Sequence, residues 1–392
     1  MDLQLSSEQR MLIETVRRFV QNEMLPLEEE IEETHVLAPE KARALFEKSR
    51  ENGLYAMNIP ERFGGGGLSA VDTMLCEEQF GHAKDILIRR AFGNVYEMLL
   101  ECNPEQVEIY LKPCVTGERT CSVAVTEPNA GSDAASIKTR ATKDGDGWIL
   151  NGNKIFISDA LYSDFFLVSA VTDPTRGAKG ISMFLVDKNT PGFIVGRDQK
   201  MMGLSGTSHC EIFFDNLRLK PINLLGKENE GFRLILTTLG RVRLGQVAAR
   251  AVGKSCRLMK YMVDYAKERK QFGKPIGDFQ FIQGMIADSA MEINAARWMV
   301  LDAAAAIDNG TDPRGTKISM VKVYAAETLG RVADRAVQVF GGMGYCAELP
   351  IERLYRDSRI YRIFDGTSEI HRMVTAGAVM REGDALFGPG GI

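Results

Sequence analysis

The apolar residues of this 392-residue chain change their spacing twice, and this change restricts the fold more than any other feature of the sequence. Residues 1–117 follow helical spacing, with a possible capping box at Ser6 and Gln9. Residues 118–228 carry short runs of β-like alternation, and residues 229–392 return to helical spacing. Strands grouped between two helical blocks cannot form a βαβ sheet, which excludes a Rossmann fold. We therefore expect three domains with these bounds.

The pattern also predicts individual elements. Helices long enough for a bundle are expected at 234–268, 281–309 and 315–340. The strand-like runs are 121–126, 148–150, 154–158, 165–172, 181–186, 193–195 and 210–214. The sequence Asp-Gly-Asp-Gly at 144–147 is a strong hairpin signal, and the spacing of the strands is typical of a barrel or a sandwich. The expected class is α+β, with more helix than strand.

The composition excludes several kinds of protein. The chain is 45% hydrophobic and 26% charged with a net charge of −4, which is ordinary for a globular protein and does not indicate binding to nucleic acid. No apolar run reaches membrane-spanning length. The 4 histidines lie far apart without metal-ligand spacing, so no metal site is expected. The 7 scattered cysteines and the absence of a signal-like N-terminus indicate a cytoplasmic protein.

One carboxylate near the C-terminus draws attention. Asp365 follows Ile363 and Phe364 and precedes Gly366, where the chain enters its last helical segment. Apolar neighbours raise the pKa of a carboxylate and leave its charge poorly solvated, which suits a proton-abstracting base. The same position before a helix also suits a simple N-cap. By itself this segment leaves both interpretations open.

Five segments that are far apart in the sequence resemble the motifs of one enzyme family. They read VTEPNAGSD at 125–133, NGNKIFIS at 151–158, ERKQFGKPI at 268–276, QVFGGMG at 338–344 and RIFDGTSEIHR at 362–372. Each segment read alone is an ordinary turn, strand or helix end. Together, over almost the whole chain, they resemble the flavin-dependent acyl-CoA dehydrogenases. The resemblance implies an N-terminal helical domain, a central β-barrel and a C-terminal domain like a four-helix bundle.

The resemblance implies FAD as the cofactor. The residues at the matching positions are Val125, Thr126, Ser132, Phe156, Ser158, Arg269, Gln271, Phe272, Gln280, Gln338, Gly342, Thr367 and Glu369. Strand alternation puts Phe156 and Ser158 on one face, where Phe156 would cover the flavin and Ser158 would bind near its N5 atom. In the family, the segments corresponding to 268–276 and 338–344 reach the FAD of a neighbouring subunit. A homotetramer, built as a dimer of dimers, is therefore expected.

The resemblance assigns Asp365 as the catalytic base, in place of the glutamate that most members carry. Substrate contacts are expected from Ser132, Arg241 and Gly366. Some members place the base on the helix around Arg241, but the corresponding residue here is Gly240, which cannot serve. An aspartate is shorter than a glutamate by one methylene, which withdraws the carboxylate by roughly 1.5 Å on an unchanged backbone. The shorter base raises the question of whether the reaction is the usual one.

The expected function is FAD-dependent α,β-dehydrogenation of an acyl-CoA to a trans-2-enoyl-CoA in the bacterial cytoplasm. An electron-transfer flavoprotein is the expected electron acceptor. The alternatives on this scaffold are a lyase, a 1,4-dehydrogenase of a cyclic acyl-CoA and an enoyl-CoA reductase. A further alternative is a non-enzymatic binding protein on a decayed scaffold, which would bind no FAD. The polar stretch from Arg89 to Glu97 falls near the family's acyl pocket and suggests a short, functionalised acyl group. A solvent-facing helix is the other interpretation of that stretch.

Overall fold

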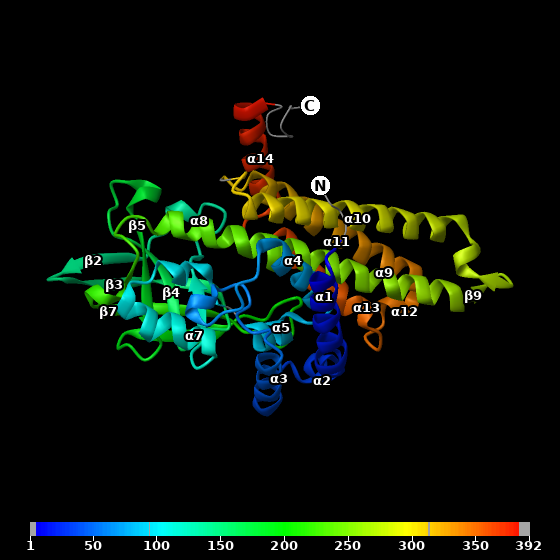
Figure 1. Cartoon of the computed structure of the whole chain (residues 1–392), viewed down its shortest axis with the longest axis horizontal. Coiled ribbons are helices and arrows are strands. Elements are labelled where there is room, and N and C mark those ends of the chain that lie inside the picture. The colour runs from blue at the N-terminus through cyan, green and yellow to red at the C-terminus, as the bar shows by residue number, and fades with distance from the viewer. Residues whose placement is uncertain (1–4, 94, 313, 384–392) are drawn as a thin grey trace.

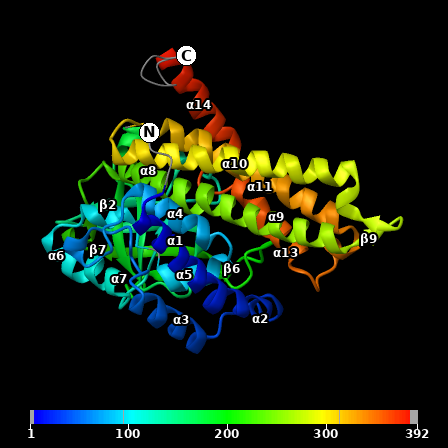
Figure 2. The same ribbon diagram turned by 45° about the vertical axis from the view of Figure 1, so that its right-hand side comes forward.

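The computed structural model describes residues 5–93, 95–312 and 314–383. The outer ends of the two expected terminal domains lie outside this range, as does Asn94 of the polar stretch. Figures 1 and 2 show a sheet with helices around it at one end of the molecule and a group of long helices that runs away from it. The expected class, mostly helical with a central β unit, is confirmed.

The N-terminal part is helical. Its α-helices are α1 Ser7–Phe19, α2 Glu28–Thr34, α3 Pro39–Glu51, α4 Ala70–Phe80, α5 Asp85–Phe92, α6 Pro104–Gln106 and α7 Lys112–Thr116. The expected capping box is confirmed, because the Ser6 hydroxyl accepts a bond from the Gln9 N–H at 3.1 Å and the Gln9 side chain accepts one from the Ser6 N–H. The glycines at 64–67 form a packed turn, in which a Cβ on Gly65 would lie 2.2 Å from the carbonyl oxygen of Ile59.

The strands β1 to β8 form one eight-stranded sheet. They are β1 Cys121–Ala124, β2 Arg140–Asp144, β3 Gly147–Ser158, β4 Phe165–Val171, β5 Ile181–Asp187, β6 Phe193–Asp198, β7 His209–Leu219 and β8 Leu224–Leu225. The order is β6-β7-β3-β2-β4-β5-β8, with β1 paired to β4. The predicted hairpin is confirmed, because Asp144 pairs with Gly147. The sequence does not predict β2, whose Arg-Ala-Thr-Lys-Asp residues lack apolar alternation.

The expected closure of these strands into a barrel is not found among the described residues. The sheet is an open path that begins at β6 and ends at β8. After the two residues of β8 the chain enters α8, Gly231–Val242, which packs against β5. No described strand therefore connects the two edges.

The C-terminal part is a bundle of long helices. After α8 it contains α9 Arg250–Glu268, α10 Gln280–Asp308, α11 Thr316–Phe340, α12 Gly342–Tyr345, α13 Pro350–Ser358 and α14 Ser368–Glu382. The three predicted bundle helices are confirmed within a few residues at each end. A π-helical turn, Arg243–Ala249, joins α8 to α9 without a break. Small side chains such as Ala248, Ala325 and Ala333 are buried where the helices pack closely.

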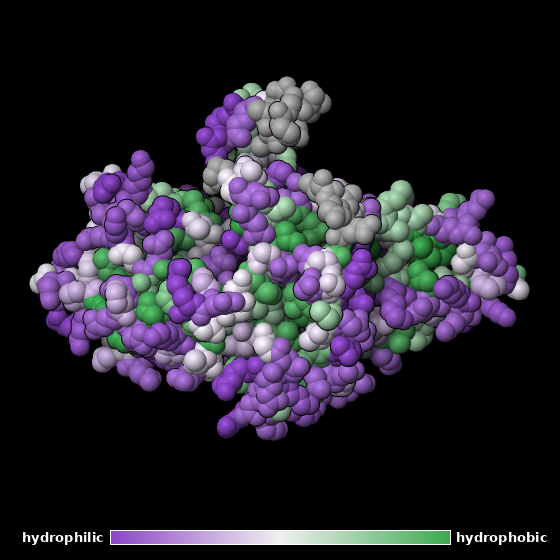
Figure 3. Space-filling view, viewed as in Figure 1, coloured by the Kyte–Doolittle hydropathy of each residue, from purple (hydrophilic) through white to green (hydrophobic). Residues whose placement is uncertain are grey.

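The surface is polar over most of the face drawn in Figure 3, with apolar residues gathered between the long helices. Among the described residues no helix combines the length and the apolar character that crossing a membrane requires. At the tip of the long helices a small hairpin, β9 Lys270–Gln271 and β10 Lys274–Pro275, links α9 to α10.

Candidate active site

Asp365 lies in a tight turn just before α14. Thr367 is the N-cap of that helix, because its hydroxyl accepts a bond from the Ile370 N–H at 3.2 Å. The interpretation of Asp365 as the N-cap is therefore wrong. The carboxylate of Asp365 is left for another role.

The backbone of this turn is left-handed. Asp365 has a φ of 54° and Gly366 a φ of 89°. Left-handed backbone is costly for most residues, but aspartate tolerates it better than most because its short polar side chain can bond locally. Gly366 is further restricted, since a Cβ there would lie 2.8 Å from Nε2 of His371. The pair Asp-Gly is thus the pair that this backbone needs.

Side chains from three separate segments hold the carbonyl groups of the turn. Arg243, in the π-helical turn, donates from Nε to the Asp365 carbonyl oxygen at 2.7 Å. Lys322, on α11, donates from Nζ to the Gly366 carbonyl oxygen at 2.7 Å. On α14, Nε2 of His371 lies 3.1 Å from the Asp365 carbonyl oxygen. None of the three stands out in the sequence, and only the position of His371 six residues after Asp365 could have signalled its role.

The electrostatics of the turn come from burial and these cations. Burial raises the pKa of Asp365, and the charges of Arg243, Lys322 and Arg89 oppose that rise. Lys322 is fully buried, which lowers its pKa to about 8 although the Asp365 charge acts in the opposite direction. Burial also lowers the pKa of His371 to about 4, so its ring is neutral near pH 7. Asp365 is thus a poorly hydrated acid whose charge is stabilised by buried cations.

The predicted flavin residues at the sheet come from two segments. Val125 and Thr126 follow β1 and are partly accessible, and Ser132 is exposed on the loop beyond them. Phe156 has a φ of 59° at an irregularity in the pairing of β3 with β7, which turns its side chain outward so that 51% of it is exposed. Ser158, at the end of β3, is also partly accessible. The loop and the strand end therefore present hydroxyls and an aromatic side chain to the surface.

A buried ion pair fixes the loop after β1. Lys154 on β3 is fully buried and donates to Oε1 of Glu127 at 2.8 Å, to the Val125 carbonyl at 3.0 Å and to Oγ of Ser169 at 3.1 Å. The other carboxylate contacts of Glu127 are the N–H groups of Lys138 and Thr139, at 2.6 and 3.0 Å. Burial lowers the pKa of Lys154 to about 8, with the Glu127 charge opposing it. The pair ties both ends of the loop to the sheet.

Two arginines on α5 pair with the residue that follows this strand. Arg90 forms a bidentate pair with Asp159, the residue after Ser158, at 3.1 and 3.3 Å. NH1 of Arg89 lies 3.6 Å from Oδ2 of Asp159. Burial raises the pKa of Tyr96 to about 12, and the charges of Asp159 and Asp365 contribute to that rise. Arg89 therefore pairs with the residue after β3, and its charge also lowers the pKa of Asp365.

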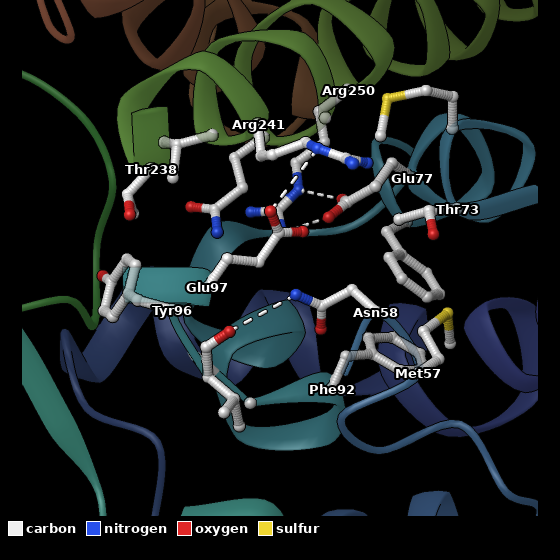
Figure 4. Close-up of a pocket in the computed structure, with 17 residues that line it drawn as sticks. Met57, Asn58, Thr73, Glu77, Phe92, Tyr96, Glu97, Thr238, Arg241 and Arg250 are labelled. Atoms are coloured by element: carbon white, nitrogen blue, oxygen red, sulfur yellow. Dashed lines mark hydrogen bonds and ion pairs between the residues drawn. The ribbon is translucent and has the colours of Figure 1, made fainter. Parts of the chain in front are cut away.

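A cavity of about 70 Å³ adjoins Tyr96 and is drawn in Figure 4. Tyr96, Glu97, Thr238 and Arg241 line it, together with residues of α4 and of the π-helical turn. Nε of Arg241 lies 3.4 Å from Oε2 of Glu97. Arg241 thus reaches the cavity, whereas Arg243 contacts the Asp365 turn. The polar stretch predicted from Arg89 to Glu97 contributes Tyr96 and Glu97 to the lining of this cavity. The stretch is therefore not simply a solvent-facing helix.

The remaining predicted FAD residues lie elsewhere on the chain. Arg269, Gln271, Phe272 and Gln280 are exposed at the tip of the long helices, as are Gln338 and Gly342. Figure 1 shows that tip, marked by β9, at the end of the molecule away from the sheet. Within one chain these residues are not brought to the 125–133 loop. Glu369, in the first turn of α14, is also exposed.

The described residues contain no cluster of histidine, cysteine, aspartate or glutamate that could hold a metal ion. The chemistry of the site depends on the carboxylate, cations and hydroxyls already described.

Comparison with known proteins identifies the family. Models of the acyl-CoA dehydrogenase N-terminal, middle and C-terminal domains match residues 6–118, 122–217 and 229–380. The chain is 38% identical to acryloyl-CoA reductase (NADH) of Anaerotignum propionicum, over 97% of this chain and 96% of that protein. It is 36% identical to the caffeyl-CoA reductase-Etf complex subunit CarC of Acetobacterium woodii, over 96% and 99%. The structure of butyryl-CoA dehydrogenase from Megasphaera elsdenii superposes with a TM-score of 0.89 at 33% identity, over 97% of this chain and all of that chain.

The fold and these matches define a flavoprotein oxidoreductase. The chain belongs to the acyl-CoA dehydrogenase family, and its cofactor is FAD. The residues around the sheet fit this group, because half of the Phe156 side chain is open beside the partly accessible Ser158 and the loop held by Lys154. An accessible aromatic face, hydroxyls and fixed backbone groups suit a flavin ring and its hydrogen-bonding edge.

Proposed function

We propose that the protein oxidises an acyl-CoA thioester across its α,β bond to a trans-2-enoyl-CoA, with Asp365 as the base. The observation that carries the proposal is the Asp365 turn, which places a carboxyl group with a raised pKa on a backbone whose carbonyls accept bonds from Arg243 and Lys322. We assign the cavity lined by Tyr96 to the acyl group. Val125, Thr126, Phe156 and Ser158, with the other predicted cofactor residues, remain the proposed FAD contacts, and Ser132, Arg241 and Gly366 the proposed substrate contacts.

In this proposal Asp365 removes the α-proton of the thioester while the β-hydrogen leaves as hydride. FAD, when bound, supplies the hydride acceptor. Burial keeps Asp365 poorly hydrated and so more basic, and the cations of Arg243 and Lys322 keep it ionised. The bonds to the Asp365 and Gly366 carbonyls fix the direction of the carboxylate. This matters because a misplacement of about 1 Å can cost roughly a hundredfold in rate.

The test is anaerobic titration of the FAD-loaded enzyme with straight, branched, cyclic and polar acyl-CoAs, followed by flavin absorbance and product analysis. Asp365→Asn should retain FAD and lose flavin reduction. The control is Asp357→Asn, which alters another buried acid that accepts a bond from the Leu204 N–H at 2.6 Å. The control should keep reduction by acyl-CoA. Near-normal activity of the Asp365→Asn enzyme would exclude Asp365 as the base.

Asp365→Glu addresses the shorter side chain. If the pocket is an ordinary one with a withdrawn base, this variant should gain activity with straight-chain substrates. If substrate or turn has adapted to the aspartate, the longer acid should lower activity, and the left-handed backbone also disfavours glutamate. Product identity separates the α,β reaction from a 1,4-dehydrogenation. A lyase is recognised by turnover of the CoA ester without net flavin reduction.

Reduction of an enoyl-CoA is the second candidate. It is supported by the raised pKa of Asp365, because a larger fraction of the carboxyl group then carries the proton that reduction must deliver to the α-carbon. The names of two relatives, acryloyl-CoA reductase and a caffeyl-CoA reductase subunit, support the same direction. Incubating the reduced enzyme with enoyl-CoA and following flavin reoxidation tests it. Faster reoxidation by enoyl-CoA than reduction by acyl-CoA would favour the reductase.

An electron-transfer flavoprotein is the proposed electron partner, supported by the Etf complex named for one relative. A homotetramer is the proposed assembly, since Phe272, Phe281 and Tyr345 are 94%, 89% and 85% exposed near the tip of the long helices. Burial of such large aromatic side chains favours association. The bacterial cytoplasm and the three domain bounds remain part of the proposal.

A further inference from the structure

The cavity beside Tyr96 has an unusual lining for an acyl chain. Its charged residues are Glu77, Glu97, Arg241 and Arg250. Glu77 and Arg250 form a close pair, with Nε 2.6 Å from Oε2, and Arg241 faces Glu97 at 3.4 Å. Figure 4 shows both pairs around the same space. Two acids and two arginines balance, so the cavity favours neither an anion nor a cation.

The cavity also offers uncharged hydrogen-bonding groups without protein partners. Thr238 lines it and is only 3% exposed, and Gln246 lines it on the next turns of the same continuous helix. Among the described residues neither the Thr238 hydroxyl nor the Gln246 amide forms a hydrogen bond through its side chain. An alkyl chain in the cavity would displace water from the buried Thr238 and the half-buried Gln246 without replacing its hydrogen bonds, which is costly.

The size of the cavity limits its occupant. Its volume is about 70 Å³, which is roughly half of the ~150 Å³ that accommodates a benzene molecule in a protein interior. Three or so non-hydrogen atoms of a ligand therefore fill it. Glu77 and Arg250 form part of the wall, and extending the chain past them would require breaking a buried ion pair.

We propose that the cavity receives the end of a short acyl group that carries an uncharged hydrogen-bonding substituent, such as a hydroxyl, bound by Thr238 and Gln246. This inference rests on the proposed function, because it assigns the cavity to the acyl group of the CoA ester. It makes Thr238 and Gln246 specificity-determining residues. A pocket built to bond a substituent rejects an analogue that lacks it far more strongly than an apolar pocket rejects an extra methylene.

The experiment compares 4-hydroxybutyryl-CoA with pentanoyl-CoA, which have equal numbers of chain atoms and differ by a hydroxyl in place of a methyl group. Succinyl-CoA probes a charged end and octanoyl-CoA probes length. Two quantities are measured: kcat/KM in the FAD-loaded enzyme, and Kd by calorimetry in Asp365→Asn, which binds without turnover. We expect 4-hydroxybutyryl-CoA to have a kcat/KM at least tenfold higher, and a Kd at least tenfold lower, than each of the other three.

The double variant Thr238→Val with Gln246→Leu keeps the shapes and removes the polar groups. It should abolish the preference and raise the relative affinity for pentanoyl-CoA. The matched control is Thr237→Val, since Thr237 is exposed on the same helix and bonds to the Arg233 carbonyl at 3.1 Å. That control should keep the preference.

Equal or better binding of pentanoyl-CoA or octanoyl-CoA to the parent enzyme would overturn the proposal, as would a preference for succinyl-CoA. An unchanged preference in the double variant would overturn the roles of Thr238 and Gln246. If no acyl-CoA reduces the flavin, the proposed function fails. The Kd series in Asp365→Asn still decides the cavity assignment in that case.

Discussion

The substitution Lys322→Met gives the sharpest test of how the Asp365 turn works. Lys322 is fully buried, and its ammonium donates to the Gly366 carbonyl at 2.7 Å. Methionine has a similar length but no charge and no donor. The change therefore removes one support of the turn and one cation near the base, without making a large cavity.

The expected size of the effect follows from Coulomb's law. Nζ of Lys322 is 2.7 Å from the carbonyl of the residue next to Asp365, so by ordinary chain dimensions the two charges are at most about 10 Å apart. At an effective dielectric constant of about 20 this separation gives roughly 1.7 kcal/mol, or about one pH unit. The cation lowers the pKa of Asp365, so its loss moves the pKa upward.

The assay is the pH dependence of kcat/KM for flavin reduction by acyl-CoA. Activity needs the ionised base, so it rises with pH through the pKa of Asp365, and this acid limb should move up by about one unit in Lys322→Met. Measurements should stay below pH 7.5, because the pKa of Lys322 itself is about 8. Loss of a buried hydrogen bond should also lower stability by about 1–3 kcal/mol.

Lys254→Met provides a matched control. Lys254 is also buried, at 1% exposure, and donates to the Ala83 carbonyl at 2.9 Å, away from the Asp365 turn. It should lose stability by a similar amount and leave the acid limb in place. If both variants shift the limb equally, or if neither does, the reasoning about Lys322 is refuted.

Three further predictions follow from buried contacts. Gly366→Ala should lower both activity and melting temperature, because its φ is 89° and a Cβ would meet His371 at 2.8 Å; an unchanged melting curve would contradict the contact. Lys154→Met should weaken FAD retention on gel filtration, since it leaves Glu127 buried without its cation; full retention would show that the loop holds without the pair. Stability should fall as the pH drops from about 6.5 to about 4, because the pKa of His371 is about 4 in the folded protein and the unfolded chain binds more protons in that window. In His371→Asn this part of the pH dependence should be smaller, as urea unfolding at several pH values would reveal.

The long helices and the capping box could be predicted because they depend on local patterns. Apolar spacing over twenty or more residues is strong evidence for α10 and α11, and the Ser6–Gln9 box is complete within four residues. The strand β2 could not be predicted in this way. This segment is a strand because it pairs with β3, and its own composition does not indicate one.

The candidate site was predicted in part. Asp365 and Gly366 stand out locally, but whether Asp365 caps the helix depends on where α14 begins, and the structure assigns that role to Thr367. The helical spacing of the sequence does not tell whether Arg241 or Arg243 contacts the Asp365 turn. Arg243 is the first residue of the π-helical turn, and its contact with Asp365 spans 122 positions, so it depends on how this helix packs against the turn before α14.

The sequence by itself determined the order of helical and β segments, the motifs that resemble the family, and the Asp-Gly pair at 365–366. These depend on residues that are close together in the chain. Only the tertiary structure decided that the sheet stays open, that Arg243, Lys322 and His371 hold the carbonyls of the Asp365 turn, and that paired charges line the cavity at Tyr96. Lys322 and Gly366 are 44 positions apart, and contacts over such separations depend on how the helices pack.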